Sequence, residues 1–196
     1  MGRVIIQSEN QLQRINSIVN HLQELRKEAV EVLIQRPTEK SWCALEVIKH
    51  MSLGQTPYNP KIENALGELA DVKEAIDPVK ATSIPSFLIK RFPPSEKGKI
   101  RFKMKTMKFF KPVFDPSSIS EADVESLFDE LFEHLEKLRG FVQQYRLKDV
   151  QAIRFNSAVG AWVRFNVAEA CEFIICHNER HMKQIENVLS GMAEDR

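Results

Sequence analysis

The sequence predicts an all-α protein, a four-helix bundle with a long basic connector between its second and third helices. Four segments repeat apolar residues at spacings of three and four, which is the period of an amphipathic helix. Between the second and third of these, the segment from Ala81 to Pro116 holds five prolines, which are incompatible with a continuous helix. A chain of 196 residues is long enough to bury one sizeable core, so we expect residues 1–196 to form a single domain.

The first helix is expected to begin with Ser8 as its N-cap and to end before Pro37. Its apolar stripe consists of Leu12, Ile15, Ile18, Val19, Leu22, Leu25, Ala29 and Leu33. The second helix begins within "SWCALEVIKHM". Gly54, Pro57 and Pro60 interrupt its pattern before "KIENALGELADVKEAI" restores it, so the sequence leaves its continuation open.

The third helix is expected to start near Ser120, where two capping boxes overlap: Ser118 with Glu121, and Ser120 with Asp123. Its stripe consists of Val124, Leu127, Phe128, Leu131, Leu135, Leu138 and Val142. The connector before it alternates basic and apolar residues from Lys99 to Lys105, which indicates an extended or strand-like piece laid over the bundle.

The fourth helix is expected to run from Asn166, with Glu169 completing a capping box, to about Ser190. The segment before it, "DVQAIRFNSAVGAW", is interpreted as an ordered loop. Two positions in the apolar stripe of this fourth helix are histidines, His177 and His181. Residues four apart on a helix are neighbours, so both imidazoles can converge on one point.

Composition excludes several classes of protein. The net charge of +1 gives no reason to expect a nucleic acid or a membrane surface as partner, and no apolar run approaches a membrane span. The three cysteines, Cys43, Cys171 and Cys176, form no disulfide framework. We therefore expect a cytoplasmic protein in which Cys171 and Cys176 are small core residues.

Two histidines on one helix supply two ligands of a metal, and a third must come from elsewhere. His50 on the second helix is the candidate, since His21 and His134 lie off their helix stripes and are expected to be solvated. The spacing of the pair does not fit the zincin motif or the di-iron bundle motif. On the residues alone, a metal site and a polar cluster satisfied in the core remain alternatives.

Three stretches resemble the DinB/YfiT-like metalloenzyme superfamily. "SWCALEVIKHM" is similar to its first histidine signature, "FIICHNERHMKQIENVL" to its second, and "FKMKTMKFFKP" to the basic connector in one branch. The resemblance implies an up-down-down-up bundle holding one divalent metal ion, zinc or nickel, through His50, His177 and His181. It also implies a small-molecule substrate, thiol-transferase or hydrolase activity, and a homodimer. The wide apolar stripes of the first and third helices could form the dimer interface.

Five further positions carry alternatives. Glu46 either orients His50 or completes a capping box at the start of its helix, and Cys43 is a poor N-cap there, which leaves Ser41 as the other candidate. Gln184 either lines the pocket beside His181 or is a partly exposed helix residue. Arg180 lies about 100° around the helix from His181, which favours a structural ion pair.

The basic run from Lys97 to Lys111 either recruits an anionic substrate, such as a low-molecular-weight thiol, or is a solvated face. The sequence thus predicts a metal-dependent enzyme of the thiol-transferase or hydrolase type with a mononuclear three-histidine site. The alternative is a non-catalytic helical bundle in which the metal or the histidine cluster is structural or serves an interaction.

Overall fold

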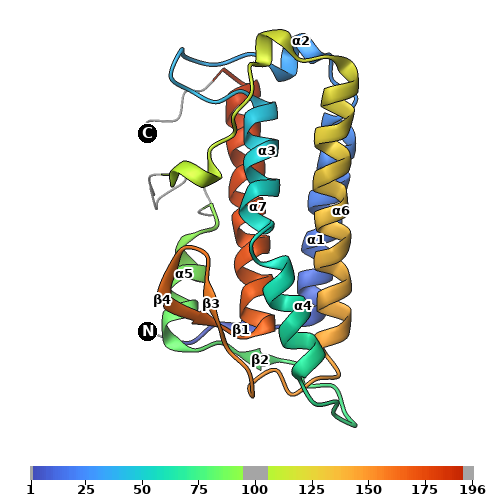
Figure 1. Ribbon diagram of the computed structural model, residues 1–196, viewed down its shortest axis with the longest axis vertical. Coiled ribbons are helices and arrows are strands. Elements are labelled where there is room, and N and C mark those ends of the chain that lie inside the picture. Colours follow the sequence, from blue (N-terminus) through green and yellow to red (C-terminus); the bar gives the residue numbers. More distant parts are fainter. Residues whose placement is uncertain (1, 95–105, 192–196) are drawn as a thin grey trace.

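Four long helical segments lie side by side in the computed structural model, which describes residues 2–94 and 106–191 (Figure 1). They confirm the predicted helical bundle: α1 (Ser8–Leu25), α3 (Ala44–Gln55) continued by α4 (Asn59–Glu68), α6 (Glu121–Tyr145) and α7 (Val167–Leu189). In Figure 1, α1 and α7 run from the lower end of the molecule to the upper end, whereas α3 and α6 run downwards. Among the described residues, no helix combines the length and the apolar character needed to cross a bilayer.

The first helix differs from its prediction at both ends. It stops at Leu25, and a separate short helix, α2 (Val30–Leu33), follows. Ser8 is the first helical residue instead of the N-cap, which is Gln7. The reason is a cap supplied from far along the chain: the Asp77 carboxylate accepts hydrogen bonds from the Ser8 N–H and from its hydroxyl.

The second helical segment does continue past its interruption. Gly54 lies inside α3, and Pro60 falls in the first turn of α4, where a missing N–H costs no hydrogen bond. Cys43, and not Ser41, takes the N-cap position of α3, and Glu46 accepts a hydrogen bond of 2.9 Å from the Cys43 N–H. Glu46 therefore completes the capping box at the start of α3.

Local capping signals placed the starts of the last two long helices correctly. Of the two overlapping boxes, the structure uses Ser120 with Asp123, while Ser118 belongs to a short 3-10 helix, η2 (Pro116–Ser118). Asn166 accepts a hydrogen bond of 2.9 Å from the Glu169 N–H, and Glu169 accepts one in return.

The connectors contain short helices that the sequence pattern does not predict. A helix, α5 (Ser83–Arg91), lies within the segment that was expected to be non-helical, with Pro85 tolerated because it falls in the first turn. A second 3-10 helix, η1 (Lys108–Phe110), follows later in the same connector. The alternating stretch from Lys99 to Lys105 lies outside the described residues.

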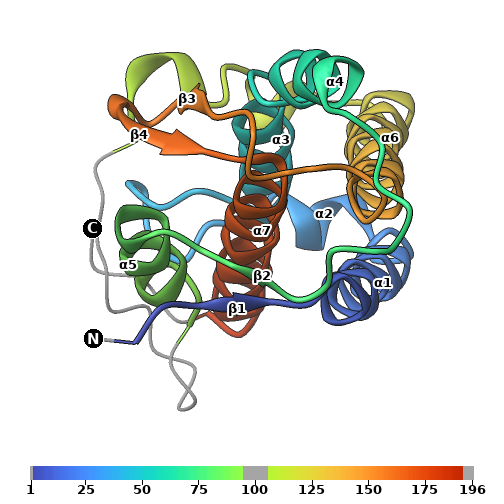
Figure 2. The ribbon, with the colours of Figure 1, turned by 90° about the horizontal axis from the view of Figure 1, so that it is seen from below.

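Two small antiparallel sheets complete the fold. Strand β1 (Ile5–Ile6) pairs with β2 (Val79–Lys80), and β3 (Phe155–Ser157) pairs with β4 (Gly160–Phe165). The second pair corrects the loop expected before α7: it is a hairpin, with Phe155 opposite Phe165. Figure 2 shows α5, the hairpin and the β1–β2 pair surrounding α7 on the side away from α6. This cover explains why every α7 residue from Val167 to Cys176 is buried.

Glu169 joins three of these elements at the beginning of α7. Its side chain is fully buried, and it accepts hydrogen bonds from the Asn166 N–H and from the N–H and hydroxyl of Thr82, which precedes α5. It also pairs with Arg154, just before β3. The Glu169 carboxylate thus fixes the hairpin and α5 to the N-terminal end of α7.

We predict that Glu169→Gln lowers the free energy of unfolding by about 2 to 3 kcal/mol, because it leaves buried donors and the Arg154 charge without their partner. Urea unfolding measures the change. The matched control is Glu186→Gln on the same helix, where an exposed pair with Lys183 is expected to contribute less than about 0.5 kcal/mol. Equal effects of the two substitutions would contradict this role for Glu169.

Candidate metal centre

Three histidines converge where α3 meets α7. His50 comes from α3, and His177 and His181 come from α7. Their ring centroids are 5.3 Å apart for His50 and His177, 4.6 Å for His50 and His181, and 4.4 Å for His177 and His181. One ring nitrogen from each lies within 4.8 Å of the other two. The structure therefore brings together the three predicted residues in one cluster.

Gly54 allows the two helices to approach this closely. A Cβ atom added at Gly54 would lie 2.7 Å from Cε1 of His177 and 3.3 Å from its Nε2. Two non-bonded carbon atoms do not come within 2.7 Å of each other unless one of them moves. No residue larger than glycine therefore fits at position 54 while the His177 ring keeps its present place. A glycine inside a helix costs about 1 kcal/mol relative to alanine, and here the contact explains its presence.

Hydrogen bonds fix the orientation of two rings. Nδ1 of His50 lies 2.7 Å from the carbonyl oxygen of Phe110 in η1, and Nδ1 of His181 lies 2.8 Å from Oε1 of Gln184. A carbonyl oxygen can only accept, so Nδ1 of His50 carries the proton and Nε2 keeps its lone pair. Gln184 thus orients His181, whereas the backbone of Phe110, and not Glu46, orients His50.

Burial keeps the three imidazoles neutral. His50 and His181 are 6% and 7% exposed, and His177 is half-buried. Desolvation lowers the pKa of each histidine below its ordinary value, and the neighbouring rings lower the pKa of His177 and His181 further. Neutral imidazole is the form that binds a metal ion, so the cluster is ready to act as a ligand set at neutral pH.

Aromatic side chains wall the cluster. Trp42 is half-buried, and its ring lies 5.1 Å from that of His50. The buried Phe92, which follows α5, lies 6.3 Å from the ring of His177, and the guanidinium of Arg180 lies over the Phe92 ring. His177 is the least buried of the three histidines, so the cluster is nearest to solvent on its side.

The remaining candidate residues lie away from the cluster. His21 is exposed, as expected, but His134 is half-buried and contacts Asn59 through Nδ1 at 2.9 Å, which corrects its expected solvation. Cys171 and Cys176 are buried in the core. Burial raises the pKa of the Cys43 thiol to about 11, which makes it a poor nucleophile at neutral pH.

Sequence reasoning missed two residues that shape the cluster. In the sequence, Gly54 indicates only an interruption of a helix, although an unexpected glycine in a helical pattern can also mark a close approach of another part of the chain. The Phe110 carbonyl is a backbone acceptor, and nothing in the sequence identifies which backbone group will face a histidine.

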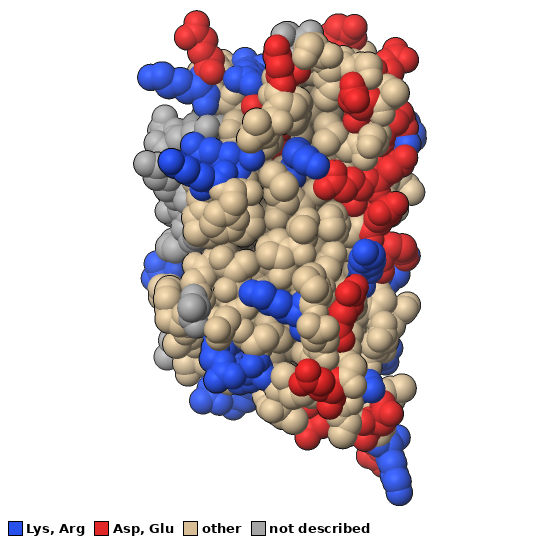
Figure 3. Space-filling model, viewed as in Figure 1, with Lys and Arg blue, Asp and Glu red and all other residues tan. Residues whose placement is uncertain are grey.

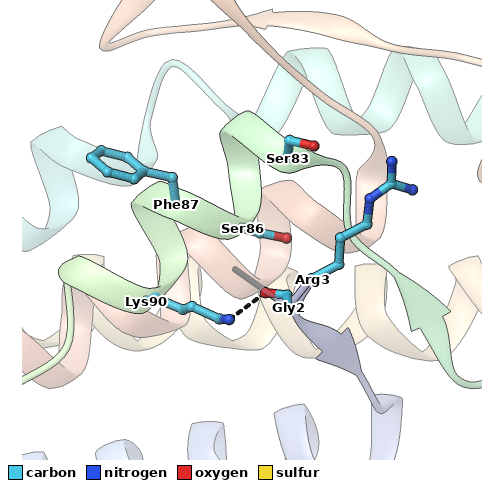
Figure 4. A pocket seen from close by; sticks show the side chains of 6 residues that line it. All are labelled: Gly2, Arg3, Ser83, Ser86, Phe87 and Lys90. Carbon is cyan, nitrogen blue, oxygen red and sulfur yellow. Dashed lines mark hydrogen bonds between the residues drawn. The ribbon is translucent and has the colours of Figure 1, made fainter.

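A surface pocket lies elsewhere, between the N-terminal segment and α5 (Figure 4). Its lining residues are Gly2, Arg3, Ser83, Ser86, Phe87 and Lys90. The ammonium of Lys90 donates to the carbonyl of Gly2. None of the three histidines lines this pocket, so it is separate from the cluster.

No family model matches the chain, and no curated protein matches it. Among solved structures, the chain is similar to YfiT from Bacillus subtilis, described as "a probable metal-dependent hydrolase with an unusual four-helix bundle topology". The match covers 92% of this chain and 85% of YfiT, with 14% sequence identity and a TM-score of 0.48. A similarity of this size assigns neither a site nor an activity to this chain. Both have to be inferred from the chain's own residues.

The neutral histidines predict a pH-dependent stability for the metal-free protein. Their pKa values are lower in the folded state, so below about pH 6.5 the unfolded chain binds protons that the folded chain does not, and stability falls as pH falls. His177, whose pKa is lowered by burial to about 3, contributes a loss of about 2 kcal/mol between pH 7 and pH 5.

Urea unfolding with a chelator present, at both pH values, tests this. His177→Gln should lose less stability on acidification than the unsubstituted protein does, because it lacks one of these groups. The matched control is His21→Gln, which replaces an exposed histidine outside the cluster. An identical pH dependence in all three proteins would show that the cluster is not held neutral.

The Gly54 contact predicts different effects of the same substitution at two helical glycines. Gly67→Ala in α4 should raise the free energy of unfolding by about 0.5 to 1 kcal/mol, because nothing lies within 4 Å of the added Cβ. Gly54→Ala should give no such gain, and should shift the imidazole resonances of His177 in the NMR spectrum. Equal stabilisation by both substitutions, with unchanged resonances, would show that the ring does not depend on Gly54.

Proposed function

We propose that the protein is a metal-dependent enzyme of the hydrolase or thiol-transferase type, with one divalent ion bound by His50, His177 and His181. The observation that supports this is the convergence of three neutral imidazole nitrogens within 4.8 Å of one another in a largely buried site. Imidazole ligands suit zinc, nickel, copper and iron. The resemblance to the DinB/YfiT-like superfamily implies zinc or nickel, so these two are the proposed cofactors.

The residues present fit such an ion. Nitrogen atoms bound at about 2.0 to 2.1 Å to one tetrahedral zinc lie about 3.4 Å apart, a spacing that small rotations of these rings can reach. The hydrogen bonds on Nδ1 of His50 and His181 leave Nε2 available, which is the arrangement usual for metal-bound histidine. Three protein ligands leave a fourth position for a substrate or a nucleophile, as in catalytic zinc sites.

An ion bound there would supply positive charge that polarises an electrophile and favours deprotonation of water or a thiol. The chain contributes the rest. Phe110 and Gln184 hold two imidazoles in place, while Trp42 and Phe92 exclude bulk water from the cluster. In this proposal a small-molecule substrate reaches the site from the side of His177, the least buried of the three histidines.

Water and a low-molecular-weight thiol are both candidate nucleophiles. Thiol transfer is what the resemblance implies, and the basic run from Lys97 to Lys111 is the segment expected to attract an anionic thiol. Its residues up to 105 lie outside the described part of the chain. We therefore propose that the bound ion activates either water or a thiol, and the activity test below covers both reactions. The up-down-down-up order of the helices and a cytoplasmic location belong to the same proposal. The location is supported by the three cysteines, which are all free, as is usual in a reducing compartment.

Metal content is the first test. Purified protein should bind about one zinc or nickel ion per chain with high affinity, because three imidazoles converge on one point. His181→Ala should lose most of this metal, while His134→Ala, which changes a half-buried histidine outside the cluster, should keep it. Elemental analysis that finds equal metal in both variants would overturn the ligand assignment.

Activity is the second test. The metal-loaded protein should hydrolyse members of an ester and amide panel, or conjugate a small thiol to an electrophile, and His177→Ala should abolish the reaction. A fully metallated protein that is inactive against both panels would favour the non-catalytic bundle, in which the metal is structural.

The homodimer stays a prediction, and the burial of its expected interface counts against it. The stripes expected to form its interface are mostly buried in the chain's own core, including Ile15 and Leu22 of α1 and Leu131 and Leu135 of α6. Light scattering at micromolar concentration checks it: twice the chain mass supports the dimer, and the monomer mass contradicts it.

A further inference from the structure

Three connecting elements form one side of the molecule. Helix α5, the 3-10 helix η1 and the β3–β4 hairpin lie on the side of α7 away from α6 in both Figure 1 and Figure 2, and α5 contacts β4 as well as α7. We call these elements the connector side. The segments that form it, residues 79–94, 106–114 and 150–166, contain no Asp or Glu. The connector side therefore has no acidic side chain of its own.

Exposed basic residues make the connector side positive. Its exposed basic side chains are Lys90, Arg91, Lys108, Lys111 and Arg164. Within the part of the chain that the structure describes, none of them forms an ion pair with an Asp or Glu, whereas Arg26 beside the bundle helices pairs with Glu125 and Asp129.

Figure 3 shows the same division of charge on one face of the molecule. Lys and Arg side chains lie around η1 on the left, and Asp and Glu side chains follow α6 on the right. The net charge of +1 is thus the sum of a basic side and an acidic side, and it gave no sign that the connector side attracts anions.

Exposed aromatic residues lie on the connector side as well. Among the described residues, the exposed Phe, Tyr and Trp side chains are Phe87 of α5, Phe109 of η1 and Trp162 of β4, which are 41%, 63% and 70% exposed. Burial of a large apolar side chain is favourable, so exposed aromatic residues gathered on one side indicate a surface that binds a partner.

Two kinds of anionic partner fit a basic surface with exposed aromatic residues: a membrane with acidic lipids, and a single-stranded nucleic acid. Ile84 and Val113 favour the membrane. Ile84 lies one turn before Phe87 on α5, Val113 follows η1, and they are 47% and 92% exposed. An aliphatic side chain offers no ring on which a base can stack, whereas it is stabilised among the acyl chains of lipids.

We propose that the connector side binds the surface of a membrane that contains anionic lipids. Trp162, Phe109 and Phe87 enter the boundary between headgroups and acyl chains, where a ring with one polar edge is favoured, and the lysines and arginines contact lipid phosphates. This binding requires no ion at the histidine cluster, so it is independent of the proposed function. Because Phe110 orients His50, η1 places the membrane contact next to the cluster.

Vesicle flotation tests the proposal. Vesicles of phosphatidylcholine alone are compared with vesicles of equal parts phosphatidylcholine and phosphatidylglycerol. The protein should bind the mixed vesicles about tenfold more tightly or better, and high salt should weaken this binding because it screens the charges. Tryptophan emission should shift to shorter wavelength on binding, and Trp162→Gln should lose this shift, because Trp42 is half-buried beside His50.

Substitutions on the connector side should weaken binding to the mixed vesicles. Trp162→Gln should lower the affinity about tenfold, because it removes apolar burial in the membrane. Lys108→Gln combined with Lys111→Gln should have an effect of about the same size, because it removes two charges near the lipid phosphates.

Matched control substitutions lie on other parts of the surface. Leu147→Gln replaces an apolar residue that is 52% exposed after α6, and Lys27→Gln combined with Lys137→Gln removes two exposed lysines near α1 and on α6. Both controls should bind the mixed vesicles as tightly as the unsubstituted protein does. Urea unfolding checks that every variant is folded.

A labelled single-stranded oligonucleotide is titrated into the same proteins. Tighter binding to the oligonucleotide than to the mixed vesicles, weakened by the connector-side substitutions, would assign this surface to nucleic acid and overturn the membrane proposal. Equal affinity for the two kinds of vesicle overturns it too, as does the absence of binding to either. Equal effects of the connector-side and control substitutions would show that the membrane contact lies elsewhere, which also overturns it.

Discussion

The close approach of α3 and α7 is the contact on which the proposed site depends. His50 belongs to one helix and His177 and His181 to the other, so their rings meet only where the two backbones come near each other. Gly54 makes this possible because the His177 ring occupies the space that a Cβ would fill. The same proximity removes water from the imidazoles and keeps them neutral, so geometry and protonation state have one cause.

The charges of α7 are arranged so that its acidic residues are occupied elsewhere. Arg14 of α1 pairs with Glu172 and Glu179, which lie on a different side of α7 from the histidines, and these carboxylates raise the pKa of Arg14. Glu169 is held by Arg154 and by the N-terminal ends of α5 and α7. These pairs bind α1, α5 and the hairpin to α7, and the carboxylates involved are satisfied without the histidines. The cluster therefore consists of neutral nitrogen ligands, and none of these carboxylates belongs to it.

Features set by neighbours along the chain were predictable from the sequence. The spacing of His177 and His181 placed both on one helix face, and the Ser120–Asp123 and Asn166–Glu169 boxes marked two helix starts, because each depends on a few consecutive residues. Features set by distant segments were not. The cap on Ser8 comes from Asp77, the Phe110 carbonyl reaches His50 from a connector, and short elements such as α5 and the β3–β4 hairpin are stabilised by packing against α7. The importance of Gly54 is of the second kind, since it depends on which ring lies opposite.

X-ray absorption spectroscopy of the zinc-loaded protein reports the atoms bound to the ion, whatever reaction the protein catalyses. If His50, His177 and His181 bind the ion, the spectrum should show three imidazole nitrogens at about 2.0 Å and one further light atom, with no sulfur. This ligand assignment also predicts that the imidazole signal falls in His177→Ala and is unchanged in His21→Ala. A sulfur shell at about 2.3 Å, or a spectrum with oxygen ligands and no imidazole signal, would contradict it, because the ion would then be bound elsewhere.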